Sequence, residues 1–372
     1  LKDDFNKYAL RQFADRVSNV GSINSAPNFG VSVAAANDIK QEFYQLLLKY
    51  VETTSYKDIL LMPKVQVTAN TAPLYNMDSV RNPGKGTACT SPASGSWGEC
   101  DLSPKRGNFF GTIAYLNSAP SSLIESNNNY KRGGNIFAVL AGQLLMAQTN
   151  GPKGLKADPV PTCVTTKDTR MVADDPKKLS GSRAPRGAVA IPKSGAICQG
   201  CHLYKALNIA SFVFRPFDQN GLIFPPTVFD APANAQDKNP YKAMVGNATA
   251  AGIVLGDSLE GAATQVKEAD LKMLYGENDS IGPQCITDRS GNKLADVSNI
   301  ADLTKHLVGD GKILVNGLSR YMPSVLFNQS TTNQEIVAAV ASGYTKGEGK
   351  LLPVFEAFFK TETFACATAS EN

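Results

Sequence analysis

The sequence predicts a mainly α-helical fold with an N-terminal helical region and long loops, and three observations lead to this prediction. Hydrophobic residues make up 42% of the 372 residues and charged residues 19%, which is typical of a globular protein with a sizeable core. Apolar residues recur at helical spacing in several segments. Stretches rich in Gly, Pro, Ser and Asn separate these segments, and such stretches favour loops.

The clearest amphipathic pattern of the N-terminal part lies between Asp38 and Val51. The apolar residues at helical spacing there are Ile39, Phe43, Leu46, Leu47 and Tyr50. Asn37 or Asp38 is an N-cap candidate, so we expect one helix to begin at this point. The run from Ile136 to Ala147 is nearly apolar but falls well short of the about 20 residues that cross a bilayer. We expect it to form a core helix, and we expect no transmembrane segment.

The C-terminal part predicts further helices. The segments with helical spacing are 203–214, 258–275, 300–308, 332–344 and 353–359. Thr332-Asn-Gln-Glu335 is a capping-box pattern, and Pro353 is suited to the first turn of the last helix. Two turn-rich stretches, residues 80–106 and 151–193, are expected to be long loops.

The seven cysteines are an odd number, and two of them belong to the motif described below. Cys89 and Cys100 bracket a loop with Pro and Gly, so a local disulfide between them is the simplest pairing. Cys285 and Cys366 could form a second disulfide. Cys163 would then be a buried free thiol, a partner in an intermolecular bond, or a sign of another pairing.

The charge pattern argues against two classes of partner. A net charge of +4 is spread over the whole chain, and no block of five or more Lys or Arg occurs. Such a weak field would not hold nucleic acid or an anionic membrane by itself. We therefore expect no nucleic-acid partner.

The motif that carries the chemistry is Cys198-Gln-Gly-Cys201-His202. This is the attachment pattern of a c-type haem, in which two thiols bond to the porphyrin and the adjacent imidazole ligates the iron. The two-residue gap places both sulfurs along one edge of the macrocycle. The sequence predicts one covalently bound haem c, with Cys198, Cys201 and His202 as its attachment and ligand residues.

Two other functions of a Cys-x-x-Cys pair fit this sequence less well. A thioredoxin-like dithiol needs a βαβ context, which the proline-containing segment from Ala184 to Lys193 does not supply. A zinc site needs a second pair of ligands at metal spacing, and the sequence contains none.

The sixth iron ligand decides between electron transfer and haem catalysis, and the sequence leaves three alternatives. Met322, followed by Pro323 and by the capped helix at 332–344, resembles the distal Met-Pro of small class I cytochromes c. His306 is the only other histidine and lies in the predicted helix 300–308. An open distal site is the third alternative. Met322 lies 121 residues beyond Cys201 (322 − 201), so an insertion such as residues 214–287 would have to fill the gap.

These features predict two regions and one cofactor. Residues 1–150 would form the N-terminal helical region with the disulfide loop, and residues 151–372 a cytochrome c-like haem domain. No leader is visible at Leu1, so we expect the mature form of an exported protein.

Four stretches of the chain resemble one known family. They are residues 43–77, Lys131-Arg-Gly-Gly-Asn-Ile-Phe with Leu140-Ala-Gly-Gln-Leu-Leu, Cys198 to Gly221, and residues 303–364. They are similar to the large secreted c-type cytochromes of planctomycetes and related bacteria, which carry three consecutive domains of unknown function. The resemblance implies a haem protein of the periplasm or the cell surface. Where relatives have Tyr-Ala-Leu-Gly-Arg this chain has Tyr321-Met-Pro-Ser, so the resemblance assigns no role to Met322.

The function expected from the motif is one-electron transfer to redox partner proteins or other cytochromes. An iron with two protein ligands cannot bind a substrate, so it exchanges electrons through the porphyrin edge. The alternatives are a peroxidase-like haem oxidoreductase with an open distal site, and a subunit of an extracellular cytochrome polymer joined through the unpaired cysteine. Whether the chain is an enzyme stays open at this point, although an electron carrier is favoured.

Overall fold

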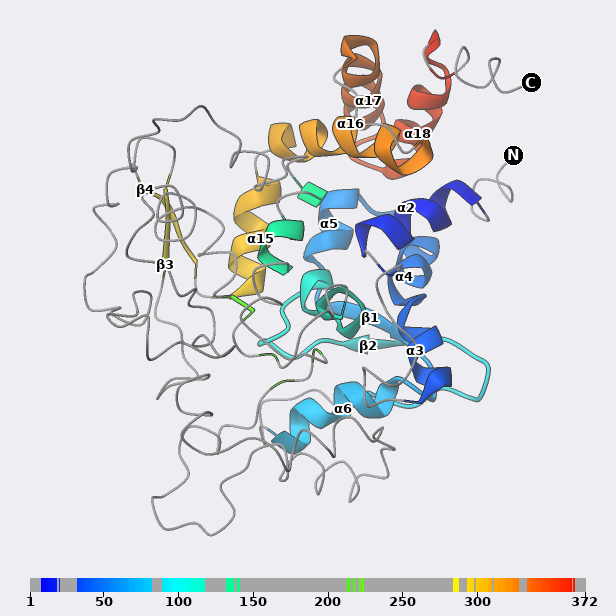
Figure 1. Cartoon of the computed structure of the whole chain (residues 1–372), viewed down its shortest axis with the longest axis vertical. Helices are drawn as coiled ribbons and strands as arrows, with labels where there is room; N and C mark the ends of the chain where they lie inside the picture. The colour runs from blue at the N-terminus through cyan, green and yellow to red at the C-terminus, as the bar shows by residue number, and fades with distance from the viewer. Residues whose placement is uncertain are drawn as a thin grey trace, which may run out of the picture.

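The computed structural model describes most of the N-terminal and C-terminal parts of the chain. The described residues are 8–18, 20, 32–81, 89–117, 132–136, 139–140, 213–214, 217, 221, 223, 284–287, 293–297, 299–309, 311–327, 333–362 and 364. This part of the chain is mostly helical, as predicted, and it adds two small antiparallel sheets of two strands each (Figure 1). The predicted helix 258–275, most of 203–214 and the predicted loop 151–193 lie outside these residues.

The elements follow one another in chain order. The N-terminal ones are α2 (Leu10–Val17), α3 (Val33–Ile39), α4 (Glu42–Tyr50), α5 (Tyr56–Leu61), β1 (Lys64–Val67), α6 (Ala72–Arg81), β2 (Gly98–Asp101), the 3-10 helix η4 (Phe109–Gly111) and α7 (Ile113–Leu116). The C-terminal ones are β3 (Gln284–Thr287), β4 (Lys293–Val297), α15 (Ile300–Gly309), α16 (Gly311–Phe327), α17 (Gln334–Lys346) and α18 (Leu351–Phe359).

The predicted amphipathic helix is present as α4, but its predicted start at Asn37 or Asp38 is wrong, because two helices meet there. Ser32 caps α3, its Oγ accepting from the Ala35 backbone N–H at 3.1 Å. Asp38 lies inside α3, and its carboxylate accepts hydrogen bonds from Thr68 and Asn70 instead of capping a helix. The chain turns between α3 and α4, so that α3 packs into one hydrophobic cluster and α4 into another.

A strand lies within the stretch 80–106 that was predicted as a loop. β2 pairs antiparallel with β1, and Cys100 lies opposite Val65 in the register. The predicted disulfide between Cys89 and Cys100 is present, with 5.2 Å between the two Cα atoms. Strands of four residues show too few alternations to stand out in a sequence, which is why the sheet was missed. Cys366 is not among the described residues, so the predicted pairing of Cys285 with Cys366 lies outside them. Cys163 is not described either.

Three C-terminal helices lie where the sequence predicted them, although α17 and α18 begin at other residues, whereas α16 was not predicted. α15 matches the predicted segment 300–308. The N-cap of α17 is Asn333, whose Oδ1 accepts from the Glu335 N–H at 2.8 Å, rather than Thr332. α18 begins at Leu351, so Pro353 occupies the first turn, where a missing N–H removes no helical hydrogen bond. α17 and α18 approach closely at Gly343 of α17. A Cβ built on this glycine would lie only 2.6 Å from the Pro353 carbonyl oxygen of α18.

One large hydrophobic cluster joins the two ends of the chain. It contains residues of α2, α4, α5, α7 and α15 to α18. Phe13 of α2 contacts Tyr56 and Phe355, with ring centroids 5.6 and 5.5 Å apart. Figure 1 shows α2 beside α16, which it contacts, although more than 290 residues separate them (311 − 17 = 294). The cluster includes residues from both sides of position 150, and the division into two regions at that position stays a prediction.

Two further observations bear on the sequence expectations. Residues 132–136 and 139–140 are helical, and Ile136, Val139 and Leu140 belong to the large cluster, so the described part of the apolar run lies in the core. Among the described residues, no helix combines the length and the apolar character needed to cross a bilayer.

Candidate functional site

The predicted haem-attachment residues Cys198, Cys201 and His202 lie outside the described residues. The two candidates for the sixth ligand, Met322 and His306, lie within them. That either of them joins Cys198, Cys201 and His202 in one site therefore stays a prediction.

Met322 lies in α16, and its side chain is fully buried in the large hydrophobic cluster. Leu318, one turn earlier in the same helix, belongs to the same cluster. The Met-Pro pair thus stands within a helix, since α16 continues to Phe327 before α17 follows. A thioether enclosed by apolar side chains suits either a core methionine or an axial iron ligand screened from water.

His306 lies in the last turn of α15 and is partly buried. Leu303 and Leu307, which flank it along the helix, are buried in the large cluster. α15 also contacts α16, so the two ligand candidates stand on neighbouring helices. An imidazole nitrogen and a thioether sulfur are both axial ligands of c-type haem iron, so either donor fits the predicted group chemically. Within the described ranges, no group of three His, Cys, Asp or Glu side chains could hold a separate metal ion.

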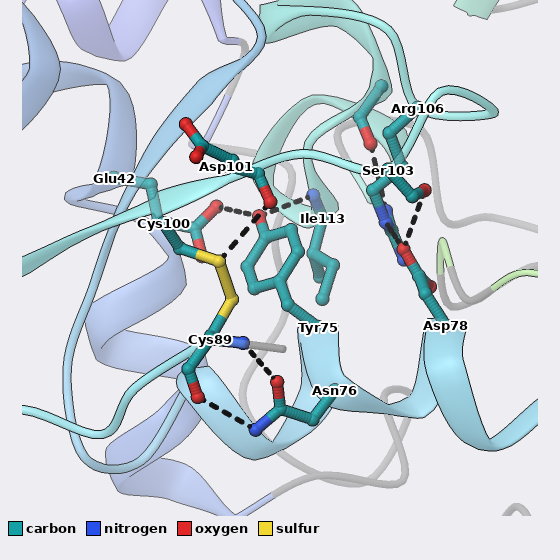
Figure 2. Close-up of polar contacts among 11 residues, drawn as sticks. Glu42, Tyr75, Asn76, Asp78, Cys89, Cys100, Asp101, Ser103, Arg106 and Ile113 are labelled. Carbon is teal, nitrogen blue, oxygen red and sulfur yellow. Dashed lines mark hydrogen bonds and ion pairs between the residues drawn. A yellow bond between two sulfur atoms is a disulfide. The ribbon is translucent and has the colours of Figure 1, made fainter. Parts of the chain in front are cut away.

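The structure adds a buried polar network that the sequence analysis did not identify (Figure 2). Its first part is an ion pair between Arg106 and Asp78, the latter on α6. The Arg106 Nε donates to one Asp78 carboxylate oxygen at 2.6 Å, and Nη2 donates to the other at 3.0 Å. Nη1 donates to the Gly111 carbonyl at 2.8 Å, and the Ser103 hydroxyl donates to Asp78 at 3.1 Å. Both charged side chains are almost fully buried.

Aromatic rings lie against the same guanidinium. The central carbon of the Arg106 guanidinium is 5.0 Å from the ring centroid of Tyr75 and 5.4 Å from that of Phe217. Burial opposes the charge of this group, but the Asp78 carboxylate holds the pKa of Arg106 above its ordinary value. Arg106 is therefore a fixed, paired cation with rings on its surface, a geometry that favours cation–π attraction.

The second part of the network is a buried carboxyl group, Glu42 at the start of α4. The Tyr75 hydroxyl donates to Glu42 Oε2 at 2.7 Å, and the Ala114 N–H donates to the same oxygen at 3.3 Å. Glu42 Oε1 has no hydrogen-bond partner among the described residues. Burial raises the pKa of Glu42 to about 8, so this carboxyl is mainly protonated at neutral pH.

A third polar group, at the surface, surrounds Glu99 in β2. The ammonium groups of Lys49 and Lys64 and the hydroxyl of Tyr50 donate to its carboxylate, at 2.7, 2.5 and 2.5 Å respectively. Partial burial acts to raise the pKa of Glu99, but these three donors lower it to about 2. The Glu99 carboxylate ties α4 to the strand next to Cys100, so this cluster is structural.

Local backbone geometry explains how Arg106 reaches its partners. The Arg106 N–H donates to the Ser103 carbonyl at 2.9 Å in a turn, and Gly107 follows with a φ of 75°. A Cβ on Gly111 would lie 1.9 Å from the Arg106 carbonyl oxygen, so only glycine permits this approach. The sequence offered one signal of this polar network. Glu42 is a charged residue on the same helix face as the apolar Leu46, four positions later. No signal in the sequence pairs Arg106 with Asp78, because 28 residues separate them.

Comparison of the whole chain with protein-family models, with curated proteins and with solved structures finds no match.

Proposed function

We propose that this chain is a single-haem c-type cytochrome that transfers one electron at a time. The observation that carries the proposal is the motif Cys198-Gln-Gly-Cys201-His202, whose spacing suits covalent attachment of a haem and ligation of its iron. The resemblance to the secreted planctomycete-type cytochromes supports the same cofactor. We place its action in the periplasm or at the cell surface, with other redox proteins as partners.

Two features of the described residues support this proposal. The disulfide between Cys89 and Cys100 suits an oxidising compartment, which is also where exported cytochromes act. Met322 and His306 each offer a donor atom of the right type next to a large apolar cluster. Apolar surroundings exclude water, and solvent access is one of the properties that set the potential of a haem iron.

Each residue of the proposed site has a separate role. Cys198 and Cys201 would hold the group through thioether bonds, and His202 would supply one axial nitrogen. Met322 or His306 would supply the sixth ligand and so exclude small molecules from the iron. The bound group would supply the one-electron couple. The chain would bury it and present its edge to a donor and an acceptor.

The first experiment asks whether the haem is covalently bound. The purified protein is denatured, extracted with acidified organic solvent and assayed for haem that stays with the chain. We expect one haem per chain in the wild type and in Cys163→Ser, and none in the double variant Cys198→Ser with Cys201→Ser. A wild-type chain without covalent haem would overturn the proposal.

The second experiment identifies the sixth ligand from absorption spectra of the oxidised and reduced protein. Met322→Leu conserves core volume, so it should cost less than about 1.5 kcal/mol of stability. We expect it to remove the weak long-wavelength ferric band of thioether ligation, whereas His306→Gln leaves that band in place. A low-spin spectrum that changes only in His306→Gln would assign the histidine. A high-spin spectrum in the wild type would instead favour the peroxidase-like alternative.

A further inference from the structure

We infer that Arg106, held by Asp78, is a positioning residue that fixes the segment following the haem-attachment motif. The contact is made through the anchor turn, which we define by its described residues, Val213, Phe214, Phe217, Gly221 and Ile223. The inference rests on the proposed function for its consequence at the haem. The contact itself is independent of that function.

The anchor turn is built onto the segment that carries Arg106. Phe217 is fully buried, and its ring faces the Arg106 guanidinium at 5.4 Å. Phe217 and Ile223 form an antiparallel β-bridge, which closes the turn. The guanidinium cannot shift without losing hydrogen bonds to Asp78 and to the Gly111 carbonyl. The Arg106 guanidinium is thus held in place, and the Phe217 ring packs against it.

A second contact holds the other side of the anchor turn. Gly221 has a φ of 72°, and a Cβ built on it would lie 2.8 Å from the Leu116 Cβ. The backbone at this point therefore lies against α7 at a distance that no larger residue tolerates. The Phe214 ring lies 6.0 Å from the ring of Tyr115, also on α7. The residues from Arg106 to Leu116 thus support the anchor turn at three places.

The anchor turn has a direct connection to the proposed haem site along the chain. Phe217 follows His202 by 15 residues (217 − 202). The sequence predicts a helix over 203–214, but Val213 and Phe214 lie in a turn, so the predicted helix would end before them and join His202 to the anchor turn. Fixing the anchor turn would therefore limit how far the imidazole and the attached ring can shift. Loosening it would admit water, which favours the ferric form and lowers the reduction potential.

The test uses the full-length holoprotein and two independent variants, Arg106→Met and Gly221→Ala. Arg106→Met removes the cation while it keeps a long side chain, and Gly221→Ala displaces the anchor turn without touching the ion pair. Hydrogen exchange is measured on the peptide that covers residues 213–223, and the midpoint potential is measured by redox titration. We expect exchange in that peptide to rise roughly tenfold or more in both variants, and the midpoint potential to fall.

Two comparisons separate positioning from general destabilisation. Arg106→Lys retains the charge beside Asp78 and Phe217 but not the paired hydrogen bonds, so it should change both measurements less than Arg106→Met does. Glu99→Gln weakens the surface cluster on β2, in which Glu99 is bonded to Lys49, Tyr50 and Lys64, and should change neither measurement. If hydrogen exchange at residues 213–223 is unchanged in folded Arg106→Met and Gly221→Ala, the inference that Arg106 fixes the anchor turn is refuted. Increased exchange with an unchanged potential would overturn its role at the haem. A wild type without covalent haem would refute the proposed function, while the exchange data would still decide the anchor.

Discussion

At the scale of single residues, Glu42 shows how burial changes the chemistry of a carboxyl group. Its charge is disfavoured because the side chain is removed from water. The charged and titratable groups that face it are Tyr75 of α6, Arg106 and Asp38 of α3. The hydrogen bond from Tyr75 and the positive charge of Arg106 both favour ionisation, but they do not offset the burial. The neutral acid is therefore the form that suits this environment.

Glu42 should make the stability of the protein depend on pH. Its pKa rises from an ordinary value of 4.5 to about 8 on folding, so the folded state binds the proton more tightly. The associated stability is fully present below about pH 4.5, falls by about 1.4 kcal/mol per pH unit above it, and is lost once the pH passes about 8. Glu42→Gln keeps the shape without the charge and should remove this dependence.

Urea unfolding of the wild type and Glu42→Gln between about pH 5 and 8 checks this expectation. The difference in unfolding free energy should grow with pH in favour of Glu42→Gln. Glu99→Gln serves as the control, because the pKa of Glu99 is lowered and its contribution is lost only as the pH falls towards about 2. Parallel curves for the wild type and Glu42→Gln would show that Glu42 is ionised in the folded protein at these pH values.

At the scale of elements, the two-stranded β1–β2 sheet is held by a disulfide and by the Glu99 cluster. Cys89 and Cys100 are both buried, and Cys89 exchanges backbone hydrogen bonds with the Asn76 side chain of α6. This sheet would be marginal alone, since two short strands do not form a stable sheet in water. The ion pair of Glu99 with Lys49 of α4, and the disulfide to Cys89, which is hydrogen-bonded to Asn76 of α6, supply the missing stability.

Removing the disulfide should destabilise this part of the fold. The loop it closes spans 11 residues, so the chain-entropy model gives about 3 kcal/mol for Cys89→Ala with Cys100→Ala. Trp97, the only tryptophan, lies next to β2 and reports unfolding of the β1–β2 sheet by fluorescence. Wild type under reducing conditions should match the double variant, and a wild type insensitive to reductant would contradict the expectation.

At the scale of the whole molecule, a shared aromatic core unites the two ends of the chain. Phe13 of α2 contacts Tyr56 of α5, Tyr321 of α16 and Phe355 of α18. The Tyr321 hydroxyl also donates to the Arg16 carbonyl at 2.5 Å, across 305 residues of sequence. Because these contacts join elements far apart in the chain, α2, α5, α16 and α18 should unfold together.

Phe13→Ala should therefore destabilise both ends of the chain at once. Loss of a buried phenylalanine costs about 3 to 5 kcal/mol, whereas Phe13→Leu should cost far less. Urea unfolding of Phe13→Ala is followed by Trp97 fluorescence for the β1–β2 sheet and by far-ultraviolet circular dichroism for the helices. Both signals should shift to lower urea by the same amount. Separate transitions would indicate that the N-terminal and C-terminal parts fold independently.

Predictions made from a sequence pattern were confirmed where that pattern lies within a single helix or a single short loop. The helix 300–308 and the Cys89–Cys100 pair are of this kind, because periodicity and loop closure act over a few residues. The helix start at Asn37 or Asp38 was wrong, because Asp38 is engaged by Thr68 and Asn70 from another part of the chain. Met322 was proposed from the Met-Pro pair ahead of a capped helix, and His306 as the only other histidine of the sequence; their roles remain predictions.

The sequence by itself determined the helical class, the disulfide loop and the motif from which a haem site is proposed, since each is written in neighbouring residues. Only the tertiary structure decided that Arg106 pairs with Asp78, that Glu42 is buried without a counter-charge of its own, and that Phe13 joins α2 to α18. These depend on contacts between distant residues. Their energies come from burial and from exclusion of water, which no local pattern specifies.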